Sequence, residues 1–308
     1  MGNPKVNPQK IRSINKSQLT AMPHPVDTKN PTAVAKYVCE RFKNMYPEAK
    51  LDFLNQLLSD VTNIFTGKHP DFQANDLKYH DFEHTLQATV CLVTLLASRH
   101  ATDAEPRLSY RNTELAIASA LLHDSGYQMS RSVKTGTGAQ FTFMHVLRSC
   151  AFAATYLPTI NVTLKEIHTV IEAIQCTGPT SMISQRHFAN PVEHIIGCAL
   201  STSDYLGQMA AADYPDELEF LYAEFEESYN YYNVPADERL FASAEALKKN
   251  TGAFWLNIVR PKLEKDFLSI YRFLSAPYPD GPNPYIIAVG KNLAEIQKRL
   301  ARNPAEIN

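Results

Sequence analysis

Apolar residues recur every three or four positions along most of this chain, which is the spacing of one helix face. The pattern predicts two helices between Pro31 and Gly67, separated at Pro47. Their buried positions are Val34, Tyr37, Val38 and Phe42 in the first helix, and Leu51, Leu54, Leu58, Val61 and Phe65 in the second. No alternation of period two is long enough for a sheet, and no segment repeats. The predicted fold is therefore all-α, a single-domain helical bundle.

Further helices are predicted in the middle of the chain. One spans about 81–98, and the next begins at Asn112 or Thr113, so that the polar segment 99–112 forms the loop between them. A later helix starts at Thr163, which is followed three residues on by a glutamate. This Thr-x-x-Glu arrangement is a capping box, in which the two side chains satisfy free backbone N–H groups at a helix start.

The last third of the chain also has helical periodicity. Apolar stripes run over 218–225 and 240–247, and a third over 255–274 contains a proline that resets the helix. The aromatic run Tyr229–Pro235 is predicted to interrupt the first two stripes as a loop. A final helix is predicted over about 285–301.

These elements suggest a simple domain layout. Residues 1–30 are a polar lead-in without an apolar pattern, and residues 31–308 form one helical domain. Within the domain, residues of about 79–208 form the motif core, which contains the histidine and aspartate motifs. Residues 213–308 form a helical C-terminal extension.

Composition narrows the classes of partner. Of the 308 residues 44% are hydrophobic, which is enough for a sizeable core, and the formal net charge of -2 provides no general attraction for nucleic acid. Five scattered cysteines without a CxxC pair indicate reduced thiols in the core. There is no leader-like apolar segment and no apolar run of 18 residues. We therefore expect a cytoplasmic protein that binds neither nucleic acid nor membranes; its oligomeric state is left open.

Three polar clusters stand in otherwise apolar helices. His123 and Asp124 lie side by side at the end of Ala118-Ser-Ala-Leu-Leu-His-Asp-Ser-Gly-Tyr127. Upstream, His80 and His84 are four residues apart and share one helix face. Downstream, Asp204 lies in a run of apolar and small residues, where an unpaired carboxylate would cost several kcal/mol. Neutral imidazoles and carboxylates are ligands for divalent cations, so we expect His84, His123, Asp124 and Asp204 to converge on one metal.

The order His84, His123-Asp124 and Asp204 resembles the HD superfamily of metal-dependent phosphohydrolases. The upstream motif Tyr-His-x-x-x-His is most similar to the cyclic-nucleotide phosphodiesterase branch, although Asp81 stands where those enzymes usually have asparagine. The resemblance implies an HD-type helical bundle and a hydrolase of small phosphoesters or nucleotides. The substrate itself is left open between a cyclic nucleotide, a nucleoside monophosphate and a non-nucleotide phosphoester.

The resemblance also implies roles for individual residues. The metal ligands would be His84, His123, Asp124 and Asp204, holding one or two ions of Zn, Mn, Fe or Mg. The first histidine of the upstream motif, His80, would act as general acid. Asp124 would have a catalytic role in addition, by bridging two metals or orienting the nucleophilic water. A metal lowers the pKa of its bound water towards neutrality, which makes that water a nucleophile for phosphorus.

Two further histidines, His145 and His168, are candidates for a second metal or for supporting the ligands. In binuclear relatives the helix that carries His168 commonly ends with a ligand histidine, whereas here it ends Ile174-Gln-Cys-Thr-Gly178. Two other functions stay open. Di-iron oxygenases of the HD type also use extra histidines, with four histidines and two aspartates around iron. A metal-binding or nucleotide-binding sensor without turnover would need coordination only.

Candidate substrate contacts lie close to the motifs. The loop Gln128–Phe143 follows Asp124 directly, and its Arg131 and Lys134, together with Arg148 on the next helix, could neutralise a phosphate. The other candidate contacts are Tyr79, Tyr205 and Gln208, and the tyrosines of the segment 229–232.

Overall fold

Helix α3 (Phe82–Ala101) runs through the centre of the protein. Its buried side chains lie on all faces of the helix, as expected for a helix whose residues are mostly apolar or small. It packs against α7 (Pro191–Met209) most extensively, and also against α1 (Pro31–Met45) and α4 (Tyr110–Leu122). The computed structural model describes residues 23–302.

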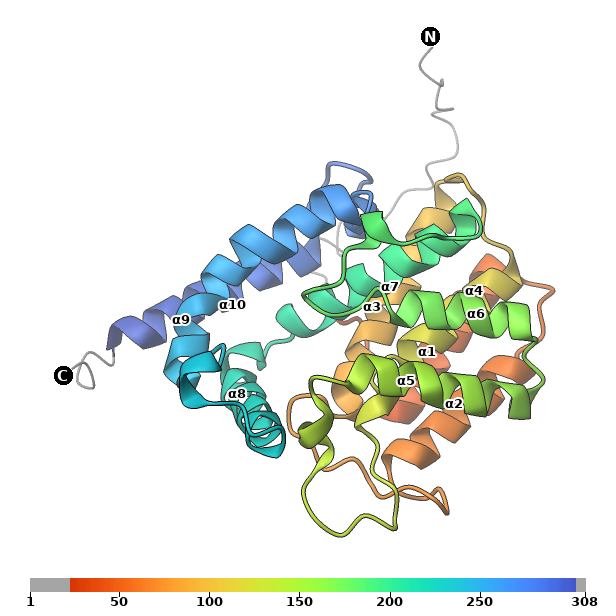
Figure 1. Ribbon diagram of the computed structural model, residues 1–308. Coiled ribbons are helices and arrows are strands. Elements are labelled where there is room, and N and C mark those ends of the chain that lie inside the picture. Colours follow the sequence, from red (N-terminus) through yellow and green to blue (C-terminus); the bar gives the residue numbers. More distant parts are fainter. Residues whose placement is uncertain (1–22, 303–308) are drawn as a thin grey trace.

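The other helices surround this centre (Figure 1). Their bounds are α2 (Asp52–Phe65), α5 (His145–Tyr156), α6 (Leu164–Ile174), α8 (Tyr214–Tyr231), α9 (Ala244–Phe254) and α10 (Pro284–Arg302). Between residues 23 and 302 there is no strand, only two isolated bridges, Thr66 with Ala74 and Phe72 with Ser130. The prediction of an all-α, single-domain fold is confirmed.

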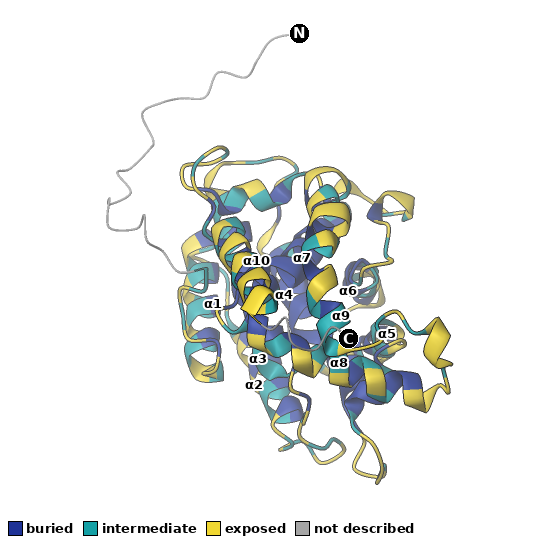
Figure 2. Cartoon of the chain, turned by 90° about the vertical axis from the view of Figure 1, so that its left-hand side faces the viewer, coloured by how far each residue is buried: buried dark blue, intermediate teal, exposed yellow. Residues whose placement is uncertain are grey.

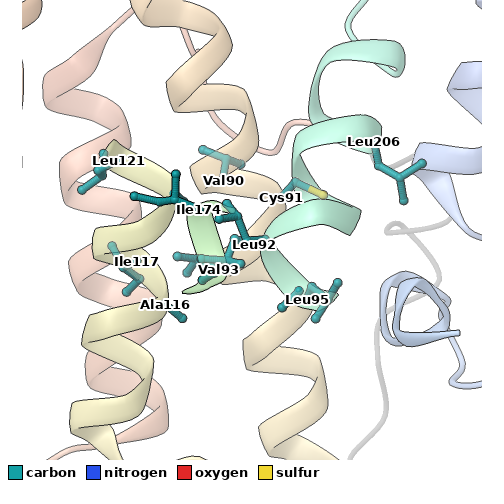
Figure 3. Close-up of a cluster of buried hydrophobic side chains, with 14 of the residues drawn as sticks. Val90, Cys91, Leu92, Val93, Leu95, Ala116, Ile117, Leu121, Ile174 and Leu206 are labelled. Carbon is teal, nitrogen blue, oxygen red and sulfur yellow. The ribbon is translucent and has the colours of Figure 1, made fainter. Parts of the chain in front are cut away.

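One hydrophobic core joins these helices. Figure 3 shows Val90 and Leu92 of α3 beside Leu121 of α4 and Ile174 of α6, while Cys91 lies on the side of α7. Figure 2 shows that the buried residues concentrate in the middle of the molecule, whereas the outer faces of the peripheral helices are exposed. Since α10 packs on α7, α8 and α9, the C-terminal extension belongs to the same domain.

Gly207 allows the close approach of α3 and α7. A Cβ atom at this position would lie 2.9 Å from the backbone nitrogen of Ala88 and 3.0 Å from its Cα. These are backbone atoms, which cannot move aside as a flexible side chain does. The absence of a side chain at Gly207 therefore sets the spacing of the two helices, one turn beyond Asp204.

The predicted boundaries in the first half are largely correct. Helices α1 and α2 begin and end within about two residues of the predicted positions, and the capping box at Thr163 is present. Helix α4 starts at Tyr110, two to three residues before the predicted start at Asn112 or Thr113. Ser109 caps this helix through the backbone N–H of Asn112, and the Asn112 side chain accepts from Ser109 in return, so the loop is shorter than 99–112.

The predictions for the C-terminal part were less accurate. The tyrosine-rich run does not interrupt the helices at Tyr229, because α8 continues through Tyr231. The next helix begins only at Ala244, and Leu240, which had been placed in its stripe, is 72% exposed. The stripe over 255–274 is not one helix but two π-helical turns and a 3-10 turn.

Most of the predicted lead-in 1–30 lies outside the described residues; only 23–30 can be described. Here the ring of His24 donates a hydrogen bond of 2.9 Å to the carbonyl oxygen of Gly207 and packs edge-on against Tyr285. Burial lowers the pKa of His24 to about 4, so the ring is neutral near neutral pH. In the range 23–302 no helix is both long and apolar enough to cross a membrane.

We expect Gly207→Ala to destabilise the protein by about 1 to 3 kcal/mol, the usual cost of overpacking, because the new methyl group meets backbone atoms of α3. The matched control is Gly290→Ala in α10, where a Cβ would meet nothing within 4 Å. That change should stabilise by about 0.5 to 1 kcal/mol. Urea denaturation measures both, and equal effects would contradict the tight α3–α7 contact.

Candidate metal centre

Three core helices bring the predicted ligands together. His84 lies in the first turn of α3, where the Asp81 side chain caps the helix by accepting from the His84 backbone N–H at 2.9 Å. His123 and Asp124 follow directly on α4, and Asp204 lies within α7. The chain thus places two helix ends and the middle of a third helix around one point.

The ligand atoms of these four residues are close neighbours. His84 Nε2 lies 3.2 Å from Asp124 Oδ2 and 3.3 Å from Asp204 Oδ1. His123 Nε2 lies 3.4 Å and 3.6 Å from the same two oxygens. His84, His123 and Asp124 form a group whose ligand atoms all lie within 4.8 Å of one another.

These distances fit a metal. Two ligand atoms that each lie about 2.1 Å from one ion in tetrahedral geometry are about 3.4 Å apart. The donor set of imidazole nitrogens and carboxylate oxygens suits Zn, Mn or Fe. The four side chains therefore could hold a metal with little movement, and their role as ligands stays a prediction.

The hydrogen bonds of His123 leave its metal-facing nitrogen free. Its Nδ1–H donates to the carbonyl oxygen of Ala120 at 2.7 Å, which fixes the tautomer because a carbonyl can only accept. Nε2 of His123 and Oδ2 of Asp124 are both buried and have no hydrogen-bond partner. Two buried electron-pair donors that face the same point call for a cation between them.

The local pKa shifts show the same need for positive charge. Burial by itself lowers the pKa of His84, but Asp124 and Asp204 outweigh it and raise the pKa to about 10. The pKa of His123 is also raised against burial by the two carboxylates. Burial would raise both carboxyl pKa values, yet the adjacent imidazoles hold the pKa of Asp124 and that of Asp204 below the usual range.

His145 lies beside this centre, at the start of α5. Its Nδ1–H donates to the Thr142 carbonyl oxygen at 2.6 Å, and its Nε2 lies 3.7 Å from Asp124 Oδ1. Burial lowers the pKa of this ring. A Cβ on Gly126 would lie 2.1 Å from the His145 carbonyl oxygen, so only glycine lets α5 start this close to Asp124. His145 is thus placed to bind a metal from the other side of that carboxylate.

His168 does not join the cluster. Its side chain is 59% exposed, and its ring faces Glu172 on the same helix at 3.9 Å. It forms no ion pair with Asp124 or Asp204. The helical pattern around this residue could not predict its orientation, since it stands at the edge of the apolar stripe of α6.

His80 is held beside the centre by a residue that sequence reasoning missed. Its Nδ1 lies 2.6 Å from Oε2 of Glu224 in α8, and Oε1 of Glu224 accepts from the backbone N–H of Tyr79 at 2.8 Å. The Glu224 side chain is 6% exposed. A glutamate in the stripe Leu218, Leu221 and Phe225 was the signal that could have identified it, because a charge on an apolar face needs a partner.

Tyr127 was also missed, although it ends the central His-Asp motif. Its ring stacks on His80 at 4.6 Å and on His145 at 4.7 Å between centroids, and the two histidine rings are 5.9 Å apart, so the three rings form one cluster. Its hydroxyl is buried without a hydrogen-bond partner. The stack links the proposed general acid to the additional histidine.

The other predicted contacts occupy different places. Tyr79 donates a hydrogen bond to the side-chain oxygen of Gln208, whose amide nitrogen donates to Asp204 Oδ1 at 3.1 Å, so these residues support a ligand. The ring of Tyr205 packs near Phe254 and Phe267, within the hydrophobic core.

The three candidate cations share one property: each donates hydrogen bonds to backbone carbonyl oxygens. The pairs are Arg131 with Gly67 and His69, Lys134 with Arg131, and Arg148 with Gly126 and Gln128. Arg148 also lies 3.6 Å above the ring of Phe141. In this conformation these side chains hold the loop Gln128–Phe143 in place, and a phosphate contact would require them to leave these carbonyls.

Helix α8 anchors the same loop. Both oxygens of Glu227 accept from Thr137, from its backbone N–H at 2.6 Å and its hydroxyl at 2.7 Å. The aromatic segment 229–232 packs on the loop too, with Tyr229 5.4 Å from Phe143 between ring centroids. The tyrosines therefore contact the loop, and α8 connects it to Glu224 and His80.

Comparison of the chain with known protein families finds no family that matches. Comparison with curated proteins also finds no match. The resemblance to the HD superfamily therefore rests on the sequence motifs alone.

We expect His84→Ala and Asp204→Asn to lose most of the bound metal, since each removes a donor from a buried set. His168→Ala is the matched histidine control and should keep full metal content, because its ring is exposed and faces Glu172. Elemental analysis of the purified variants measures this. Unchanged metal in His84→Ala would exclude the proposed ligand set.

The affinity for metal should rise with pH. Without metal His84 carries a proton below its pKa of about 10, and the metal must displace that proton. Each proton released steepens the dependence by up to about tenfold per pH unit. Titration with a competing chelator between about pH 6 and 8 measures the slope, and an affinity independent of pH would contradict this arrangement.

Proposed function

We propose that this protein is an HD-type metal-dependent phosphohydrolase that acts on a small phosphoester or nucleotide. The observation that carries the proposal is the His80–Glu224 pair beside the four predicted ligands. Coordination alone would need only His84, His123 and the two aspartates. A histidine whose Nδ1 is held by a buried carboxylate at 2.6 Å is the arrangement expected of a positioned proton donor.

Different residues of the site would bind the metal, orient the water and donate the proton during hydrolysis. A divalent metal held by the four ligands would polarise a phosphate oxygen and acidify a water. Asp124 would bridge two metals or orient that water, because its Oδ2 faces His84 and His123 while its Oδ1 faces His145. His80 keeps one proton on Nδ1 for Glu224 and presents Nε2 to the substrate, where the protonated ring supplies a proton to the departing oxygen. The Glu224 carboxylate stabilises the charged ring.

The surroundings favour a substrate with a single negative charge. A small cavity beside Tyr79 and His84 is lined by the carboxylates of Asp81, Glu83, Asp213 and Glu217. Burial raises the pKa of Glu217 to about 7, and neighbouring carboxylates add to this shift. Lys29 offsets part of this charge, since it lies 3.7 Å from Glu83 and 3.2 Å from Asp213, and the three candidate cations of the loop are bound to carbonyl oxygens. A phosphodiester, which has one charge fewer than a phosphomonoester dianion, suits such a field better.

The di-iron oxygenase remains the second candidate. It requires four histidines and two aspartates around two irons. The structure brings His84, His123 and His145 to the aspartates, but His168 lies outside and His80 is bound to Glu224. A sensor without turnover would not need the His80–Glu224 pair. Both alternatives therefore have less support than the hydrolase.

The test is a comparison of His80→Ala and Glu224→Gln with Glu219→Gln, an exposed glutamate of α8 that pairs with Lys248. We expect His80→Ala to keep its metal and to lose roughly 10² to 10⁴-fold in kcat. Glu224→Gln should lose at least about tenfold, the usual effect of removing a charged hydrogen-bond partner. The control should match wild type.

The leaving group of the substrate makes this test specific. For a general acid, the loss in His80→Ala must be large for sugar or alkyl leaving groups and small for nitrophenolate, which departs without a proton. A panel of phosphodiesters and phosphomonoesters measures this. An equal loss for all leaving groups would remove His80 from proton transfer, and oxygen consumption without phosphate release would favour the oxygenase.

A further inference from the structure

A cavity of about 160 Å³ lies at the end of α3 opposite to the candidate metal centre, and residues of the loop to α4 line it. It has room for several water molecules of about 30 Å³ each, and so for an ion of a few heavy atoms. Its charged lining residues are Arg99, Asp103 and Arg107. His84 and Arg99 are 15 residues apart on one helix, which is about 22 Å along its axis, so this cavity is separate from the metal site.

Arg99 is a buried cation without an ion-pair partner, although the Glu105 carboxylate is near enough to act on its charge. The residue is only 4% exposed, and its single hydrogen bond runs from Nη2 to the Pro106 carbonyl oxygen at 2.7 Å. No carboxylate oxygen of residues 23–302 lies within 4.0 Å of its guanidinium nitrogens. An arginine side chain stays protonated in proteins, so the positive charge persists despite burial.

The helix end compensates only part of this charge. Arg99 lies in the last turn of α3, where the free carbonyl groups carry partial negative charge. That effect is modest, whereas an arginine buried for structural reasons alone normally has a carboxylate partner. One N–H of the fork is used, and the remaining donors are left for a ligand in the cavity.

A second cation stands at the rim. The Arg107 side chain is 65% exposed and is held by Asp103 at 3.1 Å and by Glu105 at 3.4 Å. Both partners are exposed, so these ion pairs are weak and Arg107 can turn towards the cavity. Two guanidinium groups, one fixed and one mobile, form a suitable clamp for an oxyanion.

We propose that this cavity is a binding site for a small oxyanion of the phosphate type, held by Arg99 from within and by Arg107 from the rim. The site is independent of the proposed hydrolase function, because it contains none of the residues of the metal centre. Asp103 competes with the anion for Arg107 and adds repulsion, so it limits the affinity.

Inorganic phosphate is the probe, titrated into the full chain at constant ionic strength and followed by calorimetry. The background is Asp204→Asn, which disables the metal centre as a second phosphate site. In that background Arg107→Met should weaken binding about tenfold or more, and Arg99→Met should abolish it. Asp103→Asn should tighten binding, and the left-handed backbone at Asp103 (φ 53°) accepts asparagine. The control Arg260→Met, on an exposed arginine paired with Glu264, should change nothing.

The outcomes separate the two sites. Phosphate binding that survives Asp204→Asn and responds to Arg107 and Asp103 in opposite directions supports the proposal, even if Arg99→Met does not fold. Binding that is lost in Asp204→Asn belongs to the metal centre and overturns it. The proposal is also overturned by absence of binding, or by equal affinity in Arg107→Met and Arg260→Met.

Discussion

The rest of this structure depends on two carboxylates buried in an all-helical core. Asp124 and Asp204 come from different helices and face the same two histidine nitrogens. A buried charge of this kind is tolerated only with a compensating cation or donor, so three helices must meet at one point with little freedom. The tight packing of α7 on α3 at Gly207 and the approach of α5 at Gly126 both serve this convergence.

The C-terminal extension completes the site as well as covering the core. Helix α8 supplies Glu224 to His80 and Glu227 to Thr137, one turn apart. The proposed proton donor and the loop after the His-Asp motif are thus attached to the same rigid element. A movement of α8 would therefore displace both His80 and the loop Gln128–Phe143.

The positively charged side chains at the two ends of α3 have different surroundings. Near the metal centre Arg131, Lys134 and Arg148 are bound to backbone carbonyl oxygens and fix the loop. At the far end of α3 the buried Arg99 has no carboxylate partner and lines a cavity. The two ends of one helix therefore differ in their chemistry, with carboxylates and imidazoles that could hold a metal at one end and a buried arginine without an ion-pair partner at the other.

The sequence by itself determined the helices and the set of residues with chemistry. Period and caps are local properties, which is why the all-α fold and the capping box at Thr163 could be predicted from short segments. The position of His84, His123, Asp124 and Asp204 in otherwise apolar helices was enough to predict them as metal ligands from the sequence alone. The same local reasoning failed where contacts override periodicity, as at Leu240 and in the irregular turns after Trp255.

Only the tertiary structure decided which side chains meet. His80 and Glu224 are 144 residues apart, and neither segment contains a local pattern that predicts their contact. His145 and His168 are equally good candidate ligands in the sequence. In the structure His145, at the start of α5, lies next to Asp124, whereas the side chain of His168 is exposed. In the sequence Arg131 and Arg148 are candidates for binding a phosphate, and only the folded chain shows that they bind backbone carbonyl oxygens instead. The physical reason is that helix formation depends on neighbours along the chain, whereas burial and pairing of charges depend on neighbours in space.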